Sequence, residues 1–129
     1  MDNPGMERHG LIGWNELITN DLASAKSFYS ELLDWQLTSV ESENGEYAVV
    51  NVGDRKFAGM MKTPPMAGNT PPTWSCYVTV DDVDARCKRA ESLGGKVIVP
   101  PTDIPNGGRF SFITDPQGAT IGLITYTNN

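Results

Sequence analysis

Residues 14–33 read WNELITNDLASAKSFYSELL, and residues 74–93 read WSCYVTVDDVDARCKRAESL. Each stretch begins with residues that suit a strand, passes through a polar turn containing aspartate, and continues with apolar residues at the spacing of an amphipathic helix. A shorter echo follows each helix, where residues 57–61 read FAGMM and residues 120–124 read TIGLI. Because the same order recurs about sixty residues further along, the sequence predicts two copies of one structural unit.

The remaining elements follow from the turns. Helices are predicted over residues 22–33 and 83–93, and Asp21 is expected to cap the first because its carboxylate can accept hydrogen bonds from free N–H groups of the first turn. The residues between and around the helices predict strands over the following ranges: 11–19, 36–41, 46–52 and 56–62 in the first copy, and 74–80, 96–99, 109–114 and 119–126 in the second.

These elements define an α+β fold in which two tandem βαβββ modules form one curved mixed sheet with a cleft. We expect a single domain over residues 1–129, with module one at about 9–62 and module two at about 74–127. Residues 63–73 (TPPMAGNTPPT) are too rich in proline for a helix or a central strand, and they are expected to connect the modules.

Composition narrows the possible partners and location. The chain has 129 residues, 39% of them hydrophobic, and a formal net charge of −6. Without a basic stripe it is not expected to bind nucleic acid. No apolar run reaches the roughly 18 residues that cross a membrane. Two cysteines and an N-terminus without a basic-then-apolar leader predict a reduced, cytoplasmic protein.

Alternation along the strands predicts which side chains share a face. In the first strand Trp14 and Glu16 lie on the face opposite Leu17, and in residues 74–80 Ser75 and Tyr77 alternate with more apolar residues. The more apolar set should face the helix of its module, and the other set should face the concave side.

The two cysteines bear on packing rather than on chemistry. Cys76 is expected on the helix-facing side of its strand and Cys87 on the sheet-facing side of the second helix, so both are predicted to be buried thiols. Neither has a histidine nearby in the sequence to activate it as a nucleophile.

Three motifs carry a resemblance to a known family: Asp21-Leu22-x-x-Ala25-x-x-Phe28-Tyr29, Val80-Asp81-Asp82-Val83-Asp84-Ala85 and Asp115-Pro116-Gln117-Gly118-Ala119. With these motifs in this order, residues 11–126 resemble the vicinal-oxygen-chelate superfamily, which includes glyoxalase I, extradiol dioxygenases and bleomycin-resistance proteins. The resemblance implies the tandem βαβββ fold, a ligand cleft and a homodimer, in which a second chain covers open sheet edges.

Metal-dependent members of that superfamily take ligands from four equivalent strand positions, typically His, Glu or Gln, His and Glu. The resemblance places these positions at Trp14, Gly59, Ser75 and Gly122. None of these side chains supplies the imidazole, carboxylate or thiolate donors that Zn²⁺, Ni²⁺ or Fe²⁺ require. His9, the only histidine, lies outside the first strand. We therefore expect no metal and no other cofactor.

The residues expected to bind a ligand are Trp14, Glu16, Ser75, Tyr77 and Arg109. Glu16 is also the candidate catalytic residue, because a carboxylate on the concave face can act as an acid or base. The alternative is that Glu16 forms a structural ion pair with Arg109 or Arg55.

The tryptophans allow two interpretations. Trp14, Trp35 and Trp74 together can form an aromatic platform for a planar ligand. Large aromatic side chains in a small domain more often belong to the core, and we expect this of Trp35 and Trp74.

The sequence favours a metal-independent module that binds a small molecule of unknown identity. A metal-independent lyase or isomerase that uses Glu16 as acid or base is the alternative, and a non-catalytic partner subunit or regulatory domain is the second alternative. Metal-dependent lyase or dioxygenase activity is not expected.

Overall fold

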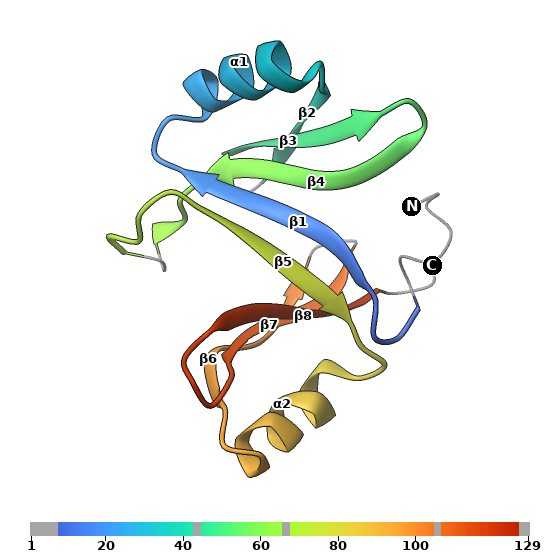
Figure 1. Ribbon diagram of the computed structural model, residues 1–129, viewed down its shortest axis with the longest axis vertical. Coiled ribbons are helices and arrows are strands. Elements are labelled where there is room, and N and C mark those ends of the chain that lie inside the picture. The colour runs from blue at the N-terminus through green and yellow to red at the C-terminus, as the bar shows by residue number, and fades with distance from the viewer. Residues whose placement is uncertain (1–7, 43–44, 66–67, 105–106, 127–129) are drawn as a thin grey trace. The chain divides into compact units, whose positions relative to one another are not determined.

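The computed structural model describes residues 8–42, 45–65, 68–104 and 107–126. The element order is βαβββ twice, so the predicted α+β class and the tandem order are confirmed (Figure 1). Among the described residues, no helix has the length and apolar character that would let it cross a membrane. The elements are β1 (Ile12–Thr19), α1 (Leu22–Leu33), β2 (Gln36–Ser42), β3 (Gly45–Val52), β4 (Arg55–Lys62), β5 (Thr73–Thr79), α2 (Val83–Ser92), β6 (Lys96–Ile104), β7 (Gly108–Thr114) and β8 (Thr120–Tyr126).

The described chain divides into two compact units. Unit one consists of residues 14–74, and unit two joins residues 8–13 to residues 75–126. In unit one the strand order is β2-β3-β4-β1, with β1 parallel to β4 and the other pairs antiparallel. In unit two the order is β5-β8-β7-β6, with β5 parallel to β8. Each unit is therefore a small mixed sheet with its own helix.

Both helices begin at an aspartate. The Asp21 carboxylate accepts a hydrogen bond from the Ser24 N–H at 3.0 Å, which confirms the predicted N-cap of α1. Asp82 accepts from the Ala85 N–H at 3.1 Å in the same way at the start of α2. These bonds satisfy donors that the first turn of a helix otherwise leaves free.

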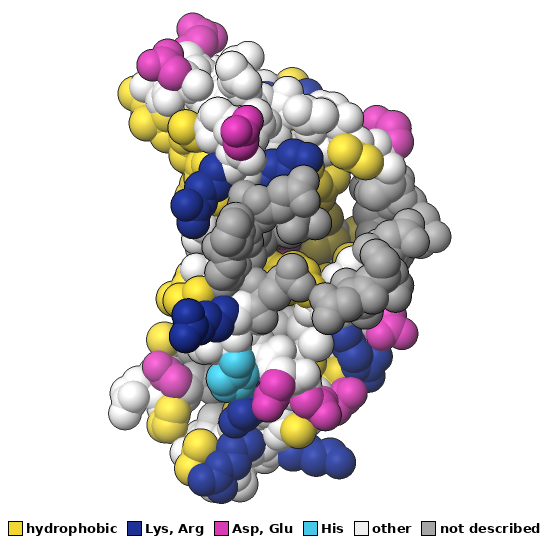
Figure 2. Space-filling view, turned by 90° about the vertical axis from the view of Figure 1, so that its right-hand side faces the viewer, with side chains coloured by type: hydrophobic (Ala, Val, Ile, Leu, Met, Phe, Trp, Pro, Cys, Tyr) yellow, Lys and Arg dark blue, Asp and Glu magenta, His cyan; other side chains and the backbone are white. Residues whose placement is uncertain are grey.

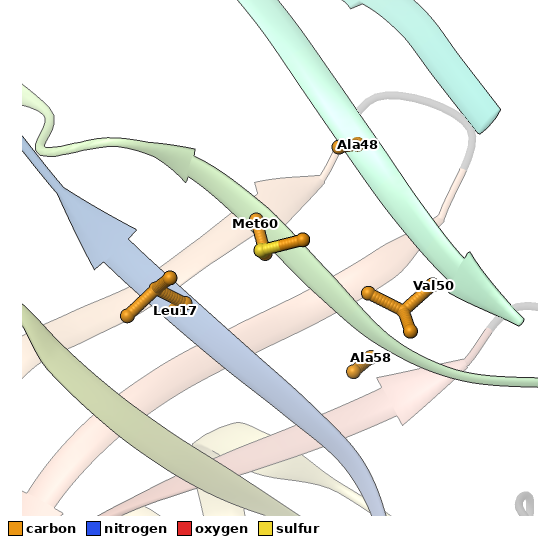
Figure 3. Close-up of a cluster of buried hydrophobic side chains, with 5 residues drawn as sticks. All are labelled: Leu17, Ala48, Val50, Ala58 and Met60. Carbon is orange, nitrogen blue, oxygen red and sulfur yellow. The ribbon is translucent and has the colours of Figure 1, made fainter. Parts of the chain in front are cut away.

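The core of unit one lies between its sheet and α1. Helix α1 covers this core with the partly buried Leu22, Ala25 and Tyr29, while none of its own residues is buried. The sheet therefore supplies the buried side chains of this core, and the helix covers them on one side. The buried cluster comes from three strands and consists of Leu17, Ala48, Val50, Ala58 and Met60 (Figure 3).

Unit two packs α2 through Val83 and Cys87 against Val80 and Leu123 of the sheet end. Cys87 is buried as predicted, and its Sγ–H donates to the Oγ of Ser111 at 3.1 Å. The Ser111 hydroxyl in turn donates to the backbone oxygen of β6 at 2.7 Å. The thiol and the hydroxyl thus satisfy each other inside an otherwise apolar layer.

The prediction that Cys76 is buried was wrong, because its side chain is only partly buried. Helix α2 packs mainly over β6 and β7. Strand β5, which carries Cys76, is separated from β7 and β6 by β8 in the strand order. A residue can therefore lie on the helix-facing side of β5 without being covered by the helix.

Strand β6 is longer than predicted, since it runs to Ile104 instead of ending near residue 99. It includes Pro100 and Pro101, and its pairing with β7 shifts register around them. Proline is tolerated here because β6 is an edge strand, where one row of N–H groups has no partner strand. The predicted end of the strand near residue 99 did not take this edge position into account.

Candidate functional site

In unit one, three side chains form a chain of hydrogen bonds on the face of the sheet opposite α1. The indole Nε1–H of Trp14 donates to the Tyr47 hydroxyl oxygen at 3.1 Å. The Tyr47 hydroxyl donates to Glu16 Oε2 at 2.8 Å. Trp14 is 8% exposed, whereas Glu16 and Tyr47 are partly exposed. We call these three residues the Trp–Tyr–Glu relay.

Gly59 makes the relay possible. Tyr47 lies on β3 and Glu16 on β1, and β4 runs between these strands with Gly59 beside Glu16 in the parallel register. A Cβ at Gly59 would lie 2.5 Å from Tyr47 Cε1, and closer still to the end of the ring. Because glycine has no side chain, the tyrosine ring can cross the middle strand and reach the carboxylate.

Unit two repeats this arrangement with different chemistry. Gly122 on β8 lies between Tyr77 on β5 and Phe112 on β7 in the strand register. A Cβ at Gly122 would lie 2.5 Å from Tyr77 Cδ2, and the rings of Tyr77 and Phe112 are 5.1 Å apart. Tyr77 is 5% exposed. Here the glycine admits an aromatic pair, without a carboxylate at the equivalent place.

Arg109 forms two ion pairs within unit two. Its guanidinium donates to both carboxylate oxygens of Asp84 at 3.1 Å and to Asp103 at 2.8 Å. Asp103 is the cross-strand neighbour of Arg109 in the β6–β7 ladder, and Asp84 lies in the first turn of α2. These contacts, Asp84 foremost, raise the pKa of Arg109. Two carboxylates of its own unit thus hold this arginine, and the alternative of a structural ion pair between Glu16 and Arg109 or Arg55 stays a prediction.

Other predicted residues lie as follows. Ser75 is partly buried on β5 of unit two. Arg55 is exposed at the start of β4. The structure thus brings Trp14 and Glu16 together within unit one, and it places Ser75, Tyr77 and Arg109 in unit two.

The prediction that Trp74 belongs to the core was wrong, because Trp74 is 38% exposed. Its indole N–H donates to the Tyr29 hydroxyl at 3.0 Å, and its ring contacts those of Tyr29 and Trp35. Trp35 is partly buried and packs against the core cluster of unit one. These rings continue to Phe28, whose centroid is 5.0 Å from that of Tyr29. They form an aromatic surface beside α1 and leave Trp14 separate on the opposite face.

Two surface depressions are not lined by the Trp–Tyr–Glu relay. One, of about 540 Å³, lies at the β3–β4 turn between Asn51 and Lys56. The other, of about 270 Å³, is lined in unit two by Arg109 and three aspartates among others. In Figure 2 basic and acidic side chains are interspersed, and the single histidine, His9, lies within reach of Asp81 at 3.7 Å. Charged side chains at the second depression form ion pairs: Asp81 with Arg86, and Asp103 with Arg109.

Two of the four positions that the resemblance equates with metal ligands, Gly59 and Gly122, have surroundings that the structure describes. Gly59 and Gly122 are buried beneath tyrosine rings, so a longer side chain at either position would collide with its ring. In the part of the chain that the structure describes, no three His, Cys, Asp or Glu side chains are grouped so that they could hold a metal ion. The polar atoms of the relay beside Gly59 belong to an indole, a phenol and one carboxylate.

Tyr47 is the residue that sequence reasoning missed. It alternates with the buried Ala48 on β3, so strand parity could have assigned its face, but sequence reasoning did not apply parity to this strand. Its contact with Glu16 depends on the strand order β3-β4-β1, which is not read from local sequence. A glycine in the middle of a strand was the available signal, because such glycines often mark the close approach of another group.

Comparison with known proteins places these features in a family. Residues 11–123 match the family model described as Glyoxalase/Bleomycin resistance protein/Dioxygenase superfamily. The protein named "Putative glyoxylase CFP32" of Mycobacterium tuberculosis is 40% identical over 119 residues, which are 90% of this chain and 46% of that protein. "Anthracycline biosynthesis protein DnrV" of Streptomyces peucetius is 32% identical over 115 residues, 89% of this chain and 41% of that protein. The chain thus spans less than half the length of these relatives.

Solved structures agree on the fold. A hypothetical protein, BH1468, of Bacillus halodurans superposes with a TM-score of 0.71 at 13% identity and covers 93% of this chain and 96% of that one. Methylmalonyl-CoA epimerase of Mycobacterium tuberculosis superposes with a TM-score of 0.65 at 19% identity, covering 99% of this chain and 94% of that one. At such identities the likeness concerns the arrangement of the chain and not its chemistry.

Proposed function

Since this chain belongs to the glyoxalase/bleomycin resistance protein/dioxygenase superfamily, we propose that it binds a small molecule without a metal, on the sheet face that carries the Trp–Tyr–Glu relay. The observation that carries the proposal is the hydrogen bond from Tyr47 to Glu16 across Gly59. It holds a partly exposed carboxylate beside an indole and a phenol. Small-molecule sites commonly combine aromatic walls with a few placed polar groups of this kind.

Absence of a metal in this function is supported by the residues at the equivalent ligand positions. Gly59 and Gly122 offer no donor atoms, and Trp14 uses its single N–H on Tyr47. Any step that requires a Lewis acid would need donors from elsewhere. In the proposed function the side chains of the relay recognise the ligand, and no metal takes part.

A ligand screen in metal-free buffer tests the proposal. The full chain is treated with EDTA, and its melting temperature is measured against a library of small molecules, with and without added Zn²⁺, Ni²⁺ or Fe²⁺. Ligands that bind the native state raise the melting temperature by mass action. We expect hits that do not depend on metal. Hits that appear only with a metal, or stoichiometric metal binding by untagged protein, would overturn the proposal.

A matched pair of variants locates the site. Glu16→Gln keeps the shape and removes the charge, while Glu41→Gln makes the same change on an exposed position of β2. Affinity for a hit should fall about tenfold or more in Glu16→Gln, as expected for the loss of a charge-assisted hydrogen bond. It should be unchanged in Glu41→Gln. Lost stability with unchanged affinity in Glu16→Gln would instead make Glu16 a structural residue.

A second candidate function rests on the same contact. A phenol 2.8 Å from a carboxylate supplies the proton-carrying partner that an acid–base role of Glu16 needs in a metal-independent lyase or isomerase. The test incubates the protein with small carbonyl compounds in D₂O and follows deuterium at the carbon beside the carbonyl by NMR. Exchange that depends on Glu16 supports this candidate, and no exchange across the panel removes it. If ligands bind without metal but no deuterium exchange occurs, only the binding function remains supported. Neither hits nor exchange would favour a partner subunit or regulatory domain.

Pairing with a second copy of the chain also belongs to the proposal. On α1, Phe28 and Leu32 are 58% and 61% exposed, and β2 is an edge strand without proline. Such apolar area and open edges favour self-association. In sedimentation velocity the wild type should be a dimer, Leu32→Lys a monomer, and the exposed control Ser27→Lys a dimer. A monomeric wild type at micromolar concentration would contradict it.

A cytoplasmic location without nucleic-acid or membrane partners completes the proposal. It is supported by the two free cysteines and by the net charge of −6. Cell fractionation tests the location, and recovery of the protein in a membrane or extracellular fraction would contradict it.

A further inference from the structure

The depression of about 540 Å³ at the β3–β4 turn is built by a tight hairpin. Its lining residues are Asn51, Gly53, Asp54 and Lys56. The turn itself has only two residues, because Val52 still pairs with Arg55 across the hairpin. Gly53, the first of the two, has a φ of 57°, a conformation that glycine adopts readily and that tight hairpin turns require. The short turn therefore places two charged residues, Asp54 and Lys56, beside the depression.

Asn51 carries a polar atom that the fold leaves unsatisfied. Its side-chain oxygen Oδ1 is buried and has no hydrogen-bond donor among the described residues. Its Nδ2 donates to Gln36 Oε1, but at 3.4 Å, which is longer than a normal hydrogen bond. Burial of an acceptor without a donor is unfavourable. The amide of Asn51 is thus held weakly, and a donor in the depression that draws Oδ1 outward would stabilise it.

A β-bulge brings a cation opposite this amide. A regular ladder would pair Asn51 with Phe57, but Asn51 pairs with Lys56 instead. Phe57 is left without an opposite residue and packs against the core of unit one. Bulges re-aim side chains and are common beside binding sites. The bulge here sets Lys56 across from the amide with the unsatisfied oxygen.

The two charged residues of the depression are available to a ligand. Asp54 and Lys56 are exposed. In the ranges that the structure describes, the ion pairs join other residues, and neither Asp54 nor Lys56 takes part in one. One anion, one cation and one unsatisfied acceptor therefore line the same depression.

We infer that this depression binds a small zwitterion of the α-amino acid type. The ammonium group of the ligand donates to Asp54 and to Oδ1 of Asn51, and its carboxylate accepts from Lys56. Charge-assisted hydrogen bonds of this kind are stronger than neutral ones. An amine or a carboxylate alone would leave one of the two charged residues without a partner. The inference concerns a site that the Trp–Tyr–Glu relay does not line, so it does not depend on the proposed function.

Two matched series of probes test the ligand class. Alanine and phenylalanine are each compared with their carboxamide, which lacks the carboxylate, and with their N-acetyl derivative, which lacks the ammonium group. Each probe is titrated to millimolar concentration into the ¹⁵N-labelled full chain. The backbone N–H signal of Gly53 reports binding, because Gly53 lines the depression. We expect at least one of the two amino acids to shift this signal in a saturable way, and both of its derivatives to bind about threefold more weakly or worse.

Four variants assign the contacts. Asn51→Leu keeps a similar volume without the acceptor, so it should abolish amino acid binding while the urea midpoint stays the same or rises. This combination distinguishes a binding residue from a structural one. Asp54→Asn and Lys56→Gln should each weaken binding about threefold or more. The control Lys62→Gln, at the exposed end of the same strand, should bind like the wild type.

The outcomes that would overturn the inference are distinct from those for the relay. No saturable shift with either amino acid, or a derivative that binds as tightly as its amino acid, refutes the zwitterion site. A lower urea midpoint in Asn51→Leu shows that its oxygen stabilises the fold and also refutes it. Unchanged affinity in Asp54→Asn or Lys56→Gln refutes recognition of both charges. None of these results alters the library screen or the Glu16→Gln test of the proposed function.

Discussion

Replacing Gly59 by alanine should displace the Tyr47 ring and break the relay. A Cβ at this position would lie 2.5 Å from Tyr47 Cε1 and nearer to the end of the ring. Contacts under 3 Å between non-bonded carbon atoms do not occur in folded proteins, so one group must move. The neighbouring backbone of β4 is held by ladders on both sides. The partly exposed tyrosine is therefore the group that gives way, and it loses its contacts with Trp14 and Glu16.

The magnitude follows from those two hydrogen bonds. The bond between Trp14 and Tyr47 joins neutral groups, worth about 0.5–1.5 kcal/mol, and the bond to Glu16 is charge-assisted, worth about 1.5–3 kcal/mol. Alanine offsets roughly 0.4–1 kcal/mol by restricting the unfolded chain more than glycine does. We therefore expect Gly59→Ala to lower the free energy of unfolding by about 1–4 kcal/mol.

Urea unfolding measures this loss, and a double-mutant cycle identifies its cause. In a Tyr47→Ala background the ring is absent and a Cβ at residue 59 has room, so Gly59→Ala should become neutral or slightly stabilising there. The Trp14 indole N–H signal should move in Gly59→Ala, because its acceptor has left. If Gly59→Ala costs as much in the Tyr47→Ala background as in the wild type, the collision is not with the ring and the account of the relay fails.

Three further expectations concern other parts of the chain. Gly122→Ala should lower the free energy of unfolding in urea more than Gly59→Ala does. A Cβ at Gly122 would lie 2.5–3.0 Å from ring atoms of Tyr77, and this buried ring cannot move into solvent. An equal or smaller loss in Gly122→Ala would contradict this. Cys76 should react with a thiol reagent in native buffer well before Cys87, and simultaneous labelling on unfolding would show that both are covered. The pKa of Asp21 is lowered in the folded protein, chiefly by its hydrogen bond with the backbone N–H of Ser24 in the first turn of α1. The stability that Asp21 contributes is therefore fully present above the ordinary carboxyl pKa near pH 4. It is lost as the pH falls through the lower pKa of the folded state. The gap in urea midpoint between wild type and Asp21→Ala should therefore narrow from pH 7 to pH 3, and a constant gap would contradict the assignment.

The order of elements was predictable because it depends on local signals. Helix spacing, the aspartate caps and the glycine and proline turns act within a few residues, so α1, α2 and most strands were placed within one or two residues. Strand parity also assigned Trp14 and Glu16 correctly to the face opposite the buried Leu17. The family resemblance followed from the same local motifs, and the family model confirms it.

Sequence reasoning was wrong where a residue's environment depends on its place in the sheet. Cys76 and Trp74 have the alternation of core residues, yet α2 covers other strands and Trp74 remains at the surface. Pro100 and Pro101 continue β6 because that strand is at an edge. The tertiary structure determines which strands lie side by side and which strands a helix covers. The periodicity of a single segment therefore cannot predict these neighbours.

The chemistry of the candidate site depended on tertiary structure in the same way. The sequence alone determined that Glu16 is a carboxylate on the face away from the helix, and that residues 59 and 122, the predicted equivalents of ligand positions in metal-dependent relatives, are glycines. Only the strand order β3-β4-β1 places the Tyr47 ring over Gly59 and its hydroxyl 2.8 Å from Glu16. Likewise, only the β6–β7 pairing brings Arg109 within hydrogen-bond distance of Asp103. Hydrogen bonds and ion pairs act over a few ångströms, and residues more than thirty positions apart in the sequence come within that range only when the chain is folded.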